Sequence, residues 1–241
     1  MIVLFLFKNM IKFNIITIFP DIFNSYLSDS LIDRALKKKL IKVKVHNLRK
    51  WTTDRHQTVD DRPYGGGLGM VFKVEPVFKA VKEILKKSKA KKRKIILFTP
   101  RGKKLDQKLV YNLSKLDEII MICGRYEGVD ERVAKHIADM ELSIGDYDLM
   151  GGELPAMVVI EAVSRLIPGV LGKKELLKER ITKEKGFIEY SQYTRPEVFK
   201  PKGKIKAKSP KEWRIPKVLI SGNHKEIEKW RNKYKKIIGS Q

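Results

Sequence analysis

The stretch SIGDYDLMGGELPAM, residues 143–157, joins a short apolar segment to the start of a helix through a turn rich in Gly and Asp. Two other apolar segments end in a similar way, in LFTPRG at 97–102 and in CGRYEG at 123–128. Glycine at these places lets backbone amides approach a ligand without a Cβ in the way. One such loop alone is typical of a plain tight turn. Three of them at one edge of a sheet favour a ligand site.

Apolar segments and amphipathic segments alternate on both sides of these loops. The pattern predicts strands over residues 11–19, 40–48, 94–99, 118–123 and 140–144. It predicts helices over residues 20–35, 75–87, 106–116, 130–137 and 153–167, and a polar, glycine-rich loop over 52–70. This alternation indicates an α/β fold with a mostly parallel sheet and helices on both faces. Ligands of such sheets bind beyond the carboxyl ends of the strands.

The alternation ends at Pro168 and Gly169, so we expect a first domain over residues 1–170. Residues 171–190 are charged and lack apolar periodicity, which is typical of a linker. Residues 191–241 are predicted to form a small helical domain, with its clearest helix over 224–238. Met10 is an alternative start, which would make residues 1–9 a spurious extension. That apolar start is too short to span a bilayer, so no membrane association is expected.

The chain of 241 residues has a formal net charge of +24. Such an excess favours a polyanion as partner, because lysines that neutralise phosphates release counterions. From residue 171 onward, 21 Lys and Arg face only 8 Asp and Glu. The alternative is a compositional habit, since Lys and Ile are abundant throughout. The single cysteine, Cys123, excludes an internal disulfide and favours a reducing cytoplasm.

Several kinds of site are excluded by missing motifs. The chain has no G-x-x-x-x-G-K-[ST] phosphate loop, and GGGLGM at 65–70 does not fit G-x-G-x-x-G. The four histidines lack metal-ligand spacing, so no metal site is predicted. No G-x-S-x-G elbow occurs. What remains is a ligand held by backbone groups, such as an adenosine recognised by its edges.

Six longer motifs, in order along the chain, resemble those of the bacterial tRNA (guanine-N1)-methyltransferases of the knotted SPOUT superfamily. They are DRHQTVDDRPYGGGLGM, CGRYEGVDERV, SIGDYDLMGGELPAM, SRLIPGVLG, YTRPEVF and LISGNHKEIEKWR. The resemblance extends from about Met10 to Lys233. It implies a deep C-terminal trefoil knot in the first domain, which periodicity does not predict because knots are very rare.

The resemblance also implies a cofactor and partners. The three loops would hold S-adenosyl-L-methionine, with magnesium left open as a further requirement. The enzyme would be a cytoplasmic homodimer with composite active sites. It would methylate N1 of guanosine 37, just 3′ of the anticodon, in tRNAs that carry a preceding guanine. The cofactor residues carried over are Leu97, Phe98, Thr99, Pro100, Gly124, Tyr126, Ile144, Gly145, Asp146, Tyr147, Asp148, Leu149, Gly151, Gly152 and Pro155.

Other residues match positions that act on the guanine. Arg165 matches the catalytic arginine and is assigned to O6 of the base. Glu127 and the loop residues Asp61, Arg62 and Gly69 match positions near the guanine. Read without the resemblance, these are a helix-end arginine, a solvated turn carboxylate and a glycine-rich surface loop.

The general base is harder to assign, because the family uses a linker aspartate and residues 171–196 contain none. We hypothesise that Glu179 takes the N1 proton, with Glu184 as the alternative. Glu189 matches another acidic position near the guanine, and Arg195 is a candidate phosphate contact. The missing aspartate leaves one rival reading, a weakened or inactive relative that only binds tRNA. A second rival, methylation of another RNA, is disfavoured by GGELPAM and YTRPE.

Overall fold

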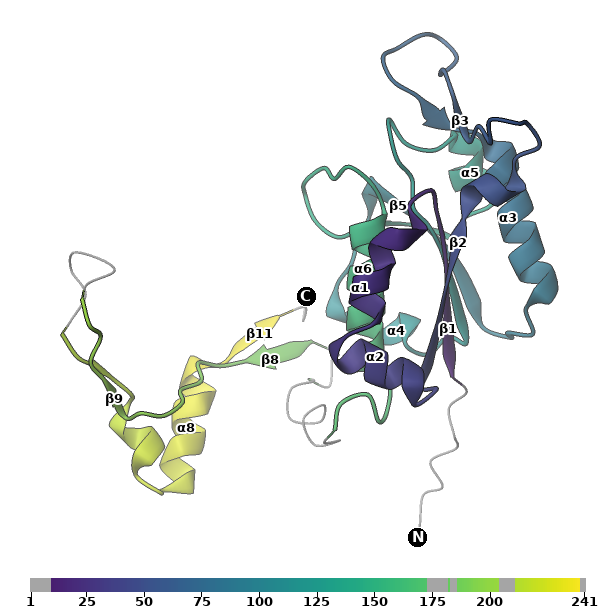
Figure 1. The fold of residues 1–241 in the computed structure, drawn as a ribbon. Coiled ribbons are helices and arrows are strands. Elements are labelled where there is room, and N and C mark those ends of the chain that lie inside the picture. The colour runs from purple at the N-terminus through teal and green to yellow at the C-terminus, as the bar shows by residue number, and fades with distance from the viewer. Residues whose placement is uncertain (1–9, 173–181, 183–185, 204–210, 239–241) are drawn as a thin grey trace. The chain divides into compact units, whose positions relative to one another are not determined.

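The computed structural model describes residues 10–172, 182, 186–203 and 211–238 (Figure 1). The chain divides into two compact units, residues 1–178 and 179–241.

The first unit is built on a five-stranded sheet with the order β2-β1-β6-β5-β7. All of its neighbouring strands pair in parallel, as the sequence predicted. The central strand β6 is buried along its whole length, because helices cover both faces of the sheet. The strands are β1 (Ile11–Thr17), β2 (Ile41–Asn47), β5 (Arg93–Lys104), β6 (Glu118–Ile122) and β7 (Met140–Ser143).

Two layers of helices enclose the sheet (Figure 1). On one face lie α2 (Ser30–Lys37), α4 (Gln107–Leu113) and α6 (Glu153–Arg165), whose buried side chains share one core cluster. On the other face lie α3 (Val74–Lys87) and α5 (Glu131–His136), which share a second cluster. The α/β layering predicted from the sequence is therefore confirmed.

The helix predicted over residues 20–35 is broken into three pieces. They are η1 (Pro20–Phe23), α1 (Asn24–Leu27) and α2. At the last break the Asp29 carboxylate accepts a hydrogen bond from the Ser30 amide at 2.6 Å, and Ser30 has a φ of 58°. Short polar side chains compete in this way with helical hydrogen bonds, which explains the interruption.

Strand β5 is longer than predicted and makes a detour at its carboxyl end. Phe98 and Lys103 both pair with Leu142 of β7, so the four residues between them leave the ladder. At the end of the detour, Gly102 passes so close to β7 that an added Cβ would lie 2.4 Å from the Leu142 amide nitrogen. Only glycine permits this approach, and the detour forms one wall of a hollow at this edge of the sheet.

The predicted polar loop lies between η2 (Leu48–Trp51) and α3. It contains only a short antiparallel pair, β3 (Asp60–Asp61) with β4 (Val71–Phe72). Four glycines, at 65, 66, 67 and 69, have positive φ, a backbone conformation that other residues rarely adopt.

The second unit differs from the helical domain that the sequence predicted. Its described residues include one α-helix, α8 (His224–Tyr234), and a short η3 (Lys217–Ile220). They also include two antiparallel pairs, β8 (Phe187–Glu189) with β11 (Lys236–Ile238), and β9 (Val198–Phe199) with β10 (Trp213–Arg214). The helix predicted to reach residue 238 thus stops at Tyr234. Strand β8 lies within the segment 171–190 that was predicted to be a linker.

Within the described ranges, no helix combines the length and the apolar character needed to cross a membrane.

Candidate active site

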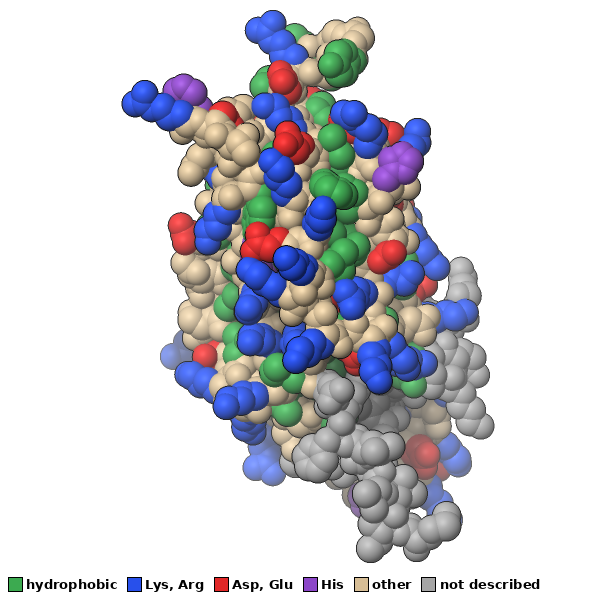
Figure 2. All heavy atoms as spheres, turned by 90° about the vertical axis from the view of Figure 1, so that its right-hand side faces the viewer, with side chains coloured by type: hydrophobic (Ala, Val, Ile, Leu, Met, Phe, Trp, Pro, Cys, Tyr) green, Lys and Arg blue, Asp and Glu red, His purple; other side chains and the backbone are tan. Residues whose placement is uncertain are grey.

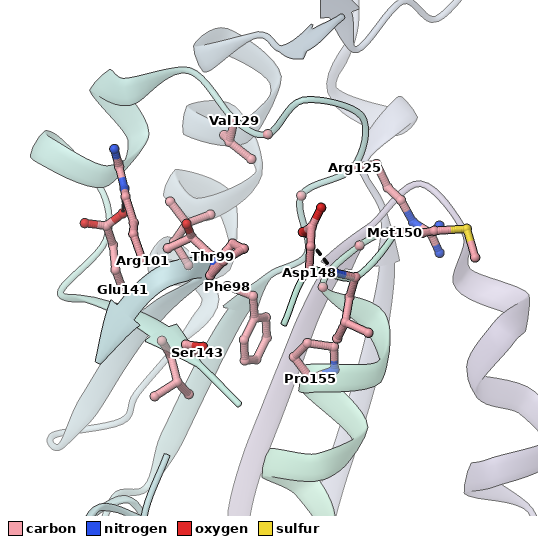
Figure 3. A pocket seen from close by; sticks show the side chains of 18 of the residues that line it. Phe98, Thr99, Arg101, Arg125, Val129, Glu141, Ser143, Asp148, Met150 and Pro155 are labelled. Atoms are coloured by element: carbon pink, nitrogen blue, oxygen red, sulfur yellow. Dashed lines mark hydrogen bonds and ion pairs between the residues drawn. The ribbon is translucent and has the colours of Figure 1, made fainter. Parts of the chain in front are cut away.

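A hollow of about 490 Å³ lies beyond the carboxyl ends of β5, β6 and β7 (Figure 3). Its walls are the β5 detour, the loop after β6, and the loop between β7 and α6. This is the edge where the sequence placed a ligand site. All the residues predicted to hold the cofactor line the hollow except Asp146, which instead pairs with Lys104.

The glycines allow two of these loops to lie against each other. The Gly152 amide donates to the Gly124 carbonyl at 3.1 Å, and Arg125 and Gly151 form an isolated antiparallel bridge. A Cβ added at Gly152 would lie 2.7 Å from the Cα of Cys123. The loop before α6 therefore packs directly on the end of β6, and backbone groups form much of the wall.

A buried carboxylate fastens this corner of the hollow. Glu153, at the start of α6, is 1% exposed. Its Oε1 accepts from the Thr17 hydroxyl at 2.7 Å, and its Oε2 accepts from Nε of Arg125 at 2.9 Å. The Arg125 guanidinium also lies over the Phe19 ring, 4.7 Å from its centroid. Glu153 thereby ties the end of β1, the loop after β6 and helix α6 together.

No sequence motif predicted a role for Thr17, Arg125 or Glu153. Arg125 and Glu153 stand inside the motifs CGRYEG and GGELPAM. An acidic residue in the first turn of a helix is ordinarily explained by the helix dipole alone. Its burial and its contact with β1, 136 residues away, come only from the three-dimensional structure.

The charged groups that line the hollow are largely paired. Arg101 donates to Glu141 at 2.9 Å and to Glu131 at 2.5 Å, and Figure 3 shows Arg101 and Glu141 side by side. The hydrogen bond from Arg101 lowers the pKa of the Glu131 carboxyl. Behind the wall, complete burial raises the pKa of the Cys123 thiol well above its ordinary value. The hollow therefore combines paired arginines, apolar side chains such as Phe98 and Pro155, and backbone groups.

Of the residues predicted to act on the guanine, Glu127 lines the hollow. Its amide donates to the Met70 carbonyl at 3.1 Å. A Cβ added at Gly69 would lie 2.6 Å from Cγ of Glu127, so the glycine-rich loop meets the hollow here. Asp61 and Arg62 are exposed farther along that loop and do not line the hollow, and Asp61 lies 4.0 Å from Nζ of Lys73.

The structure places Arg165 away from the hollow of its own chain. It is the exposed last residue of α6, whereas Pro155 at the other end of that helix lines the hollow. Ten residues of helix separate the two Cα atoms by about 15 Å. Glu189 and Arg195 belong to the second unit. Glu179 and Glu184, the two candidates for the general base, lie outside the described residues.

In the part of the chain that the structure describes, no group of three or more His, Cys, Asp or Glu side chains is placed to hold a metal ion.

Comparisons with known proteins agree with the motifs. The family model described as tRNA (Guanine-1)-methyltransferase TrmD matches residues 11–238. A tRNA (guanine-N(1)-)-methyltransferase of Dictyoglomus turgidum is 47% identical over 224 residues, covering 93% of this chain and 84% of the relative. One of Clostridioides difficile is 42% identical over 220 residues, covering 91% and 90%. The crystal structure of the tRNA (m1G37) methyltransferase from Aquifex aeolicus superposes with a TM-score of 0.72 at 41% identity, covering 92% and 88%.

Proposed function

The chain belongs to the tRNA (guanine-1)-methyltransferase TrmD family, and from this premise we propose how its residues perform the reaction. The protein is a tRNA (guanine-N1)-methyltransferase that methylates guanosine 37. The comparisons give no support to an inactive, merely tRNA-binding relative, because the similar proteins are named as methyltransferases. We place the enzyme in the cytoplasm with its tRNA substrate, and we propose that a guanine before position 37 is part of recognition.

We propose that the methyl donor is S-adenosyl-L-methionine, bound in the hollow. A volume of about 490 Å³ suits a ligand of this size. Partly exposed backbone at Gly124 and Gly151 is able to bond the edges of an adenine, while Leu97 and Phe98 offer apolar contact. The detour of β5 around β7 and the close packing of Gly152 on Cys123 support a knotted arrangement of these loops.

The cofactor would supply an activated methyl group, and the protein would supply position and electrostatics. Guanine N1 carries a proton at neutral pH, so a general base is needed. Glu179 remains our proposal for that base, with Glu184 as the alternative. Arg165 is proposed to stabilise the negative charge that grows on O6 as the proton leaves. Glu127 lines the hollow and is proposed to orient the guanine.

The position of Arg165 supports a homodimer with composite active sites. About 15 Å of helix separates Arg165 from Pro155 at the hollow of its own chain, so we propose that Arg165 serves the hollow of a partner subunit. Asp61, Arg62 and Gly69 are proposed to border the same composite site. Glu189 and Arg195 would contribute from the second unit, which we propose binds tRNA.

The observation that carries this proposal is the match of the family model over residues 11–238, in a chain whose glycine loops line one hollow. The test is transfer of a radiolabelled methyl group from S-adenosyl-L-methionine to unmodified tRNA transcripts. Label is expected with guanosine 37 and not with adenosine 37. Replacing the preceding guanine is expected to reduce transfer. Equal labelling with guanosine 37 and adenosine 37, or no labelling of either, would contradict the assignment.

Subunit mixing tests the composite site. Arg165→Ala and Gly152→Val are each expected to inactivate the enzyme. Mixed after joint refolding, they should recover about a quarter of the wild-type activity, because half of the random dimers are mixed and each has one intact site. If the mixture stays inactive while mixed dimers form, Arg165 acts within its own chain.

A further inference from the structure

The positive charge of the first unit is concentrated at the end of the sheet opposite the hollow. Residues 10–172 contain 30 Lys and Arg and 20 Asp and Glu, a surplus of ten. Twelve of the cations, which we call the lysine edge, lie at the amino ends of β1, β2 and β5 and at the C-terminus of α3. They are Lys12, Lys38, Lys39, Lys42, Lys44, Lys86, Lys87, Lys89, Lys91, Lys92, Arg93 and Lys94.

Few acids balance the lysine edge. Four acids accompany it at this end of the sheet: Glu83 on α3, Asp117 and Glu118 at the start of β6, and Asp139 at the start of β7, so the lysine edge holds most of the surplus in residues 10–172. Figure 2 shows the face that carries α3, with Lys and Arg side chains gathered over its lower half. The hollow, by contrast, is lined by charges that largely pair with one another, such as Arg101 with Glu131 and Glu141.

The backbone under the lysine edge is held in place. The Asp117 carboxylate accepts from the amides of Lys91 and Lys92 at 3.2 and 2.9 Å. The Lys12 amide donates to the Asp117 carbonyl at 2.9 Å. Asp117 thus joins the connection between α3 and β5 to the start of β1, and the lysines project from an ordered base.

Part of the lysine edge converges on a second hollow of about 100 Å³. Lys12, Lys42, Lys44, Lys87 and His46 line it. Its floor is the carboxylate of Glu118, which is 2% exposed. Both oxygens of that carboxylate are engaged, by the amide nitrogen of Asn14 at 3.1 Å and by the hydroxyl of Ser88 at 2.5 Å.

Most of these cations have no anionic partner among the residues that the structure describes. Within the described residues, Lys87 is the one member of the lysine edge that forms an ion pair, with Glu83 at 2.6 Å. The other lysines repel one another, and a bound polyanion would relieve that repulsion. The second hollow has room for about three waters, or for one phosphate group.

We propose that the lysine edge is a second RNA-binding surface, which takes the phosphodiester backbone of the substrate tRNA outside its anticodon arm. The inference rests on tRNA being the substrate. Lysines at many backbone positions suit phosphates, which they neutralise without reading sequence. The five residues of β6 alone span about 16 Å between Glu118 and the cofactor hollow. Phosphates at the lysine edge therefore lie well away from the reacting guanine.

The test compares two triple variants in RNA binding. Lys42→Gln/Lys44→Gln/Lys89→Gln removes three exposed charges of the lysine edge. Lys79→Gln/Lys108→Gln/Lys135→Gln removes the same charge from α3, α4 and α5 elsewhere on the unit. The dissociation constant is measured for full-length unmodified tRNA and for its isolated anticodon stem-loop, between 50 and 200 mM KCl.

The lysine-edge variant should bind full-length tRNA about tenfold more weakly at 50 mM KCl. The slope of log K against log salt should become shallower by about 2 to 3. Binding of the stem-loop and kcat at saturating tRNA should not change. An unchanged tRNA affinity, an equal loss in the control variant, or an equal loss with the stem-loop would overturn the proposal. Since binding is measured without transfer, an inactive wild type would refute the proposed function separately.

Discussion

Replacing Glu153 by alanine would leave the Arg125 guanidinium and the Thr17 hydroxyl without their common partner. Breaking a buried pair by removing one member costs about 3–5 kcal/mol, because the remaining charge stays desolvated. The Arg125 side chain is 20% exposed, so water can solvate part of it, which favours the lower end of that range. The lost acceptor for Thr17 adds about 1 kcal/mol or more. We expect Glu153→Ala to lower the free energy of unfolding by about 3–5 kcal/mol.

Urea unfolding followed by circular dichroism measures this effect. With a slope of about 2–3 kcal/mol per M, the midpoint should fall by about 1–2 M. Glu153→Gln keeps the shape and one acceptor oxygen, so it should cost about 1–2 kcal/mol. It should also weaken S-adenosyl-L-methionine binding about tenfold in calorimetry, because the Arg125 wall of the hollow is no longer fixed.

Lys37→Ala is the matched control. Lys37 pairs with Asp33 at 2.6 Å, but its side chain is 74% exposed, so the loss should stay below about 0.5 kcal/mol. If Glu153→Ala unfolds at the same urea concentration as Lys37→Ala, the buried carboxylate does not hold this corner of the hollow together.

Further predictions concern the hollow, the proposed chemistry and two titratable groups. Gly152→Ala would place a Cβ 2.7 Å from the Cα of Cys123, so the affinity for S-adenosyl-L-methionine, measured by calorimetry, should fall more than about tenfold. The control variant Gly172→Ala should bind the cofactor normally, because no atom lies within 4 Å of its added Cβ. Arg165→Ala should lower kcat by about 10²–10³ in single-turnover methyl transfer and leave cofactor affinity unchanged; a loss of cofactor affinity instead would make it a binding residue. Because burial raises the pKa of the Cys123 thiol, iodoacetamide should label native protein at least about 100-fold more slowly than urea-unfolded protein, as mass spectrometry can show. Burial and the charge of Lys44 lower the pKa of His46 below its ordinary value of 6.5, so the unfolded state binds more protons than the folded state as the pH falls through that value. The free energy of unfolding should therefore fall between about pH 7 and 5.5, and His46→Gln should make that fall smaller.

The layers of the first unit follow from local patterns in the sequence. Apolar runs such as EIIMI at 118–122 require cover on both faces, and alternation with helices then leaves few arrangements other than a parallel sheet. The position of the hollow follows too, because the carboxyl ends of parallel strands meet at one edge. The glycine loops that line the hollow were also predictable, because glycine marks places where the backbone must pass close to other atoms.

Features that depend on distant partners were not visible. Residues 236–238 continue a helical pattern, yet they form β11 by pairing with Phe187–Glu189, nearly fifty residues earlier. The burial of Glu153 depends on Thr17 at the far end of the chain. Likewise, the identity of Arg165 gives no indication that α6 carries it about 15 Å from the hollow of its own chain. Short-range sequence patterns determine helices and strands, whereas contacts between residues far apart in the chain depend on the topology of the fold.

The two ends of the sheet serve different physical needs. A site that takes a proton from guanine N1 must place one base and one cation accurately, and a surplus of mobile lysines around it would compete for the carboxylate that acts as base. In the first unit both arginines that line the hollow are paired with carboxylates, Arg101 with Glu131 and Glu141, and Arg125 with Glu153. Its surplus positive charge lies at the amino ends of the strands, where binding phosphates requires positive charge but not the accurate placement of single side chains. Separating accurate placement from general attraction explains how a chain with a net charge of +24 has a hollow with no lysine among its described lining residues.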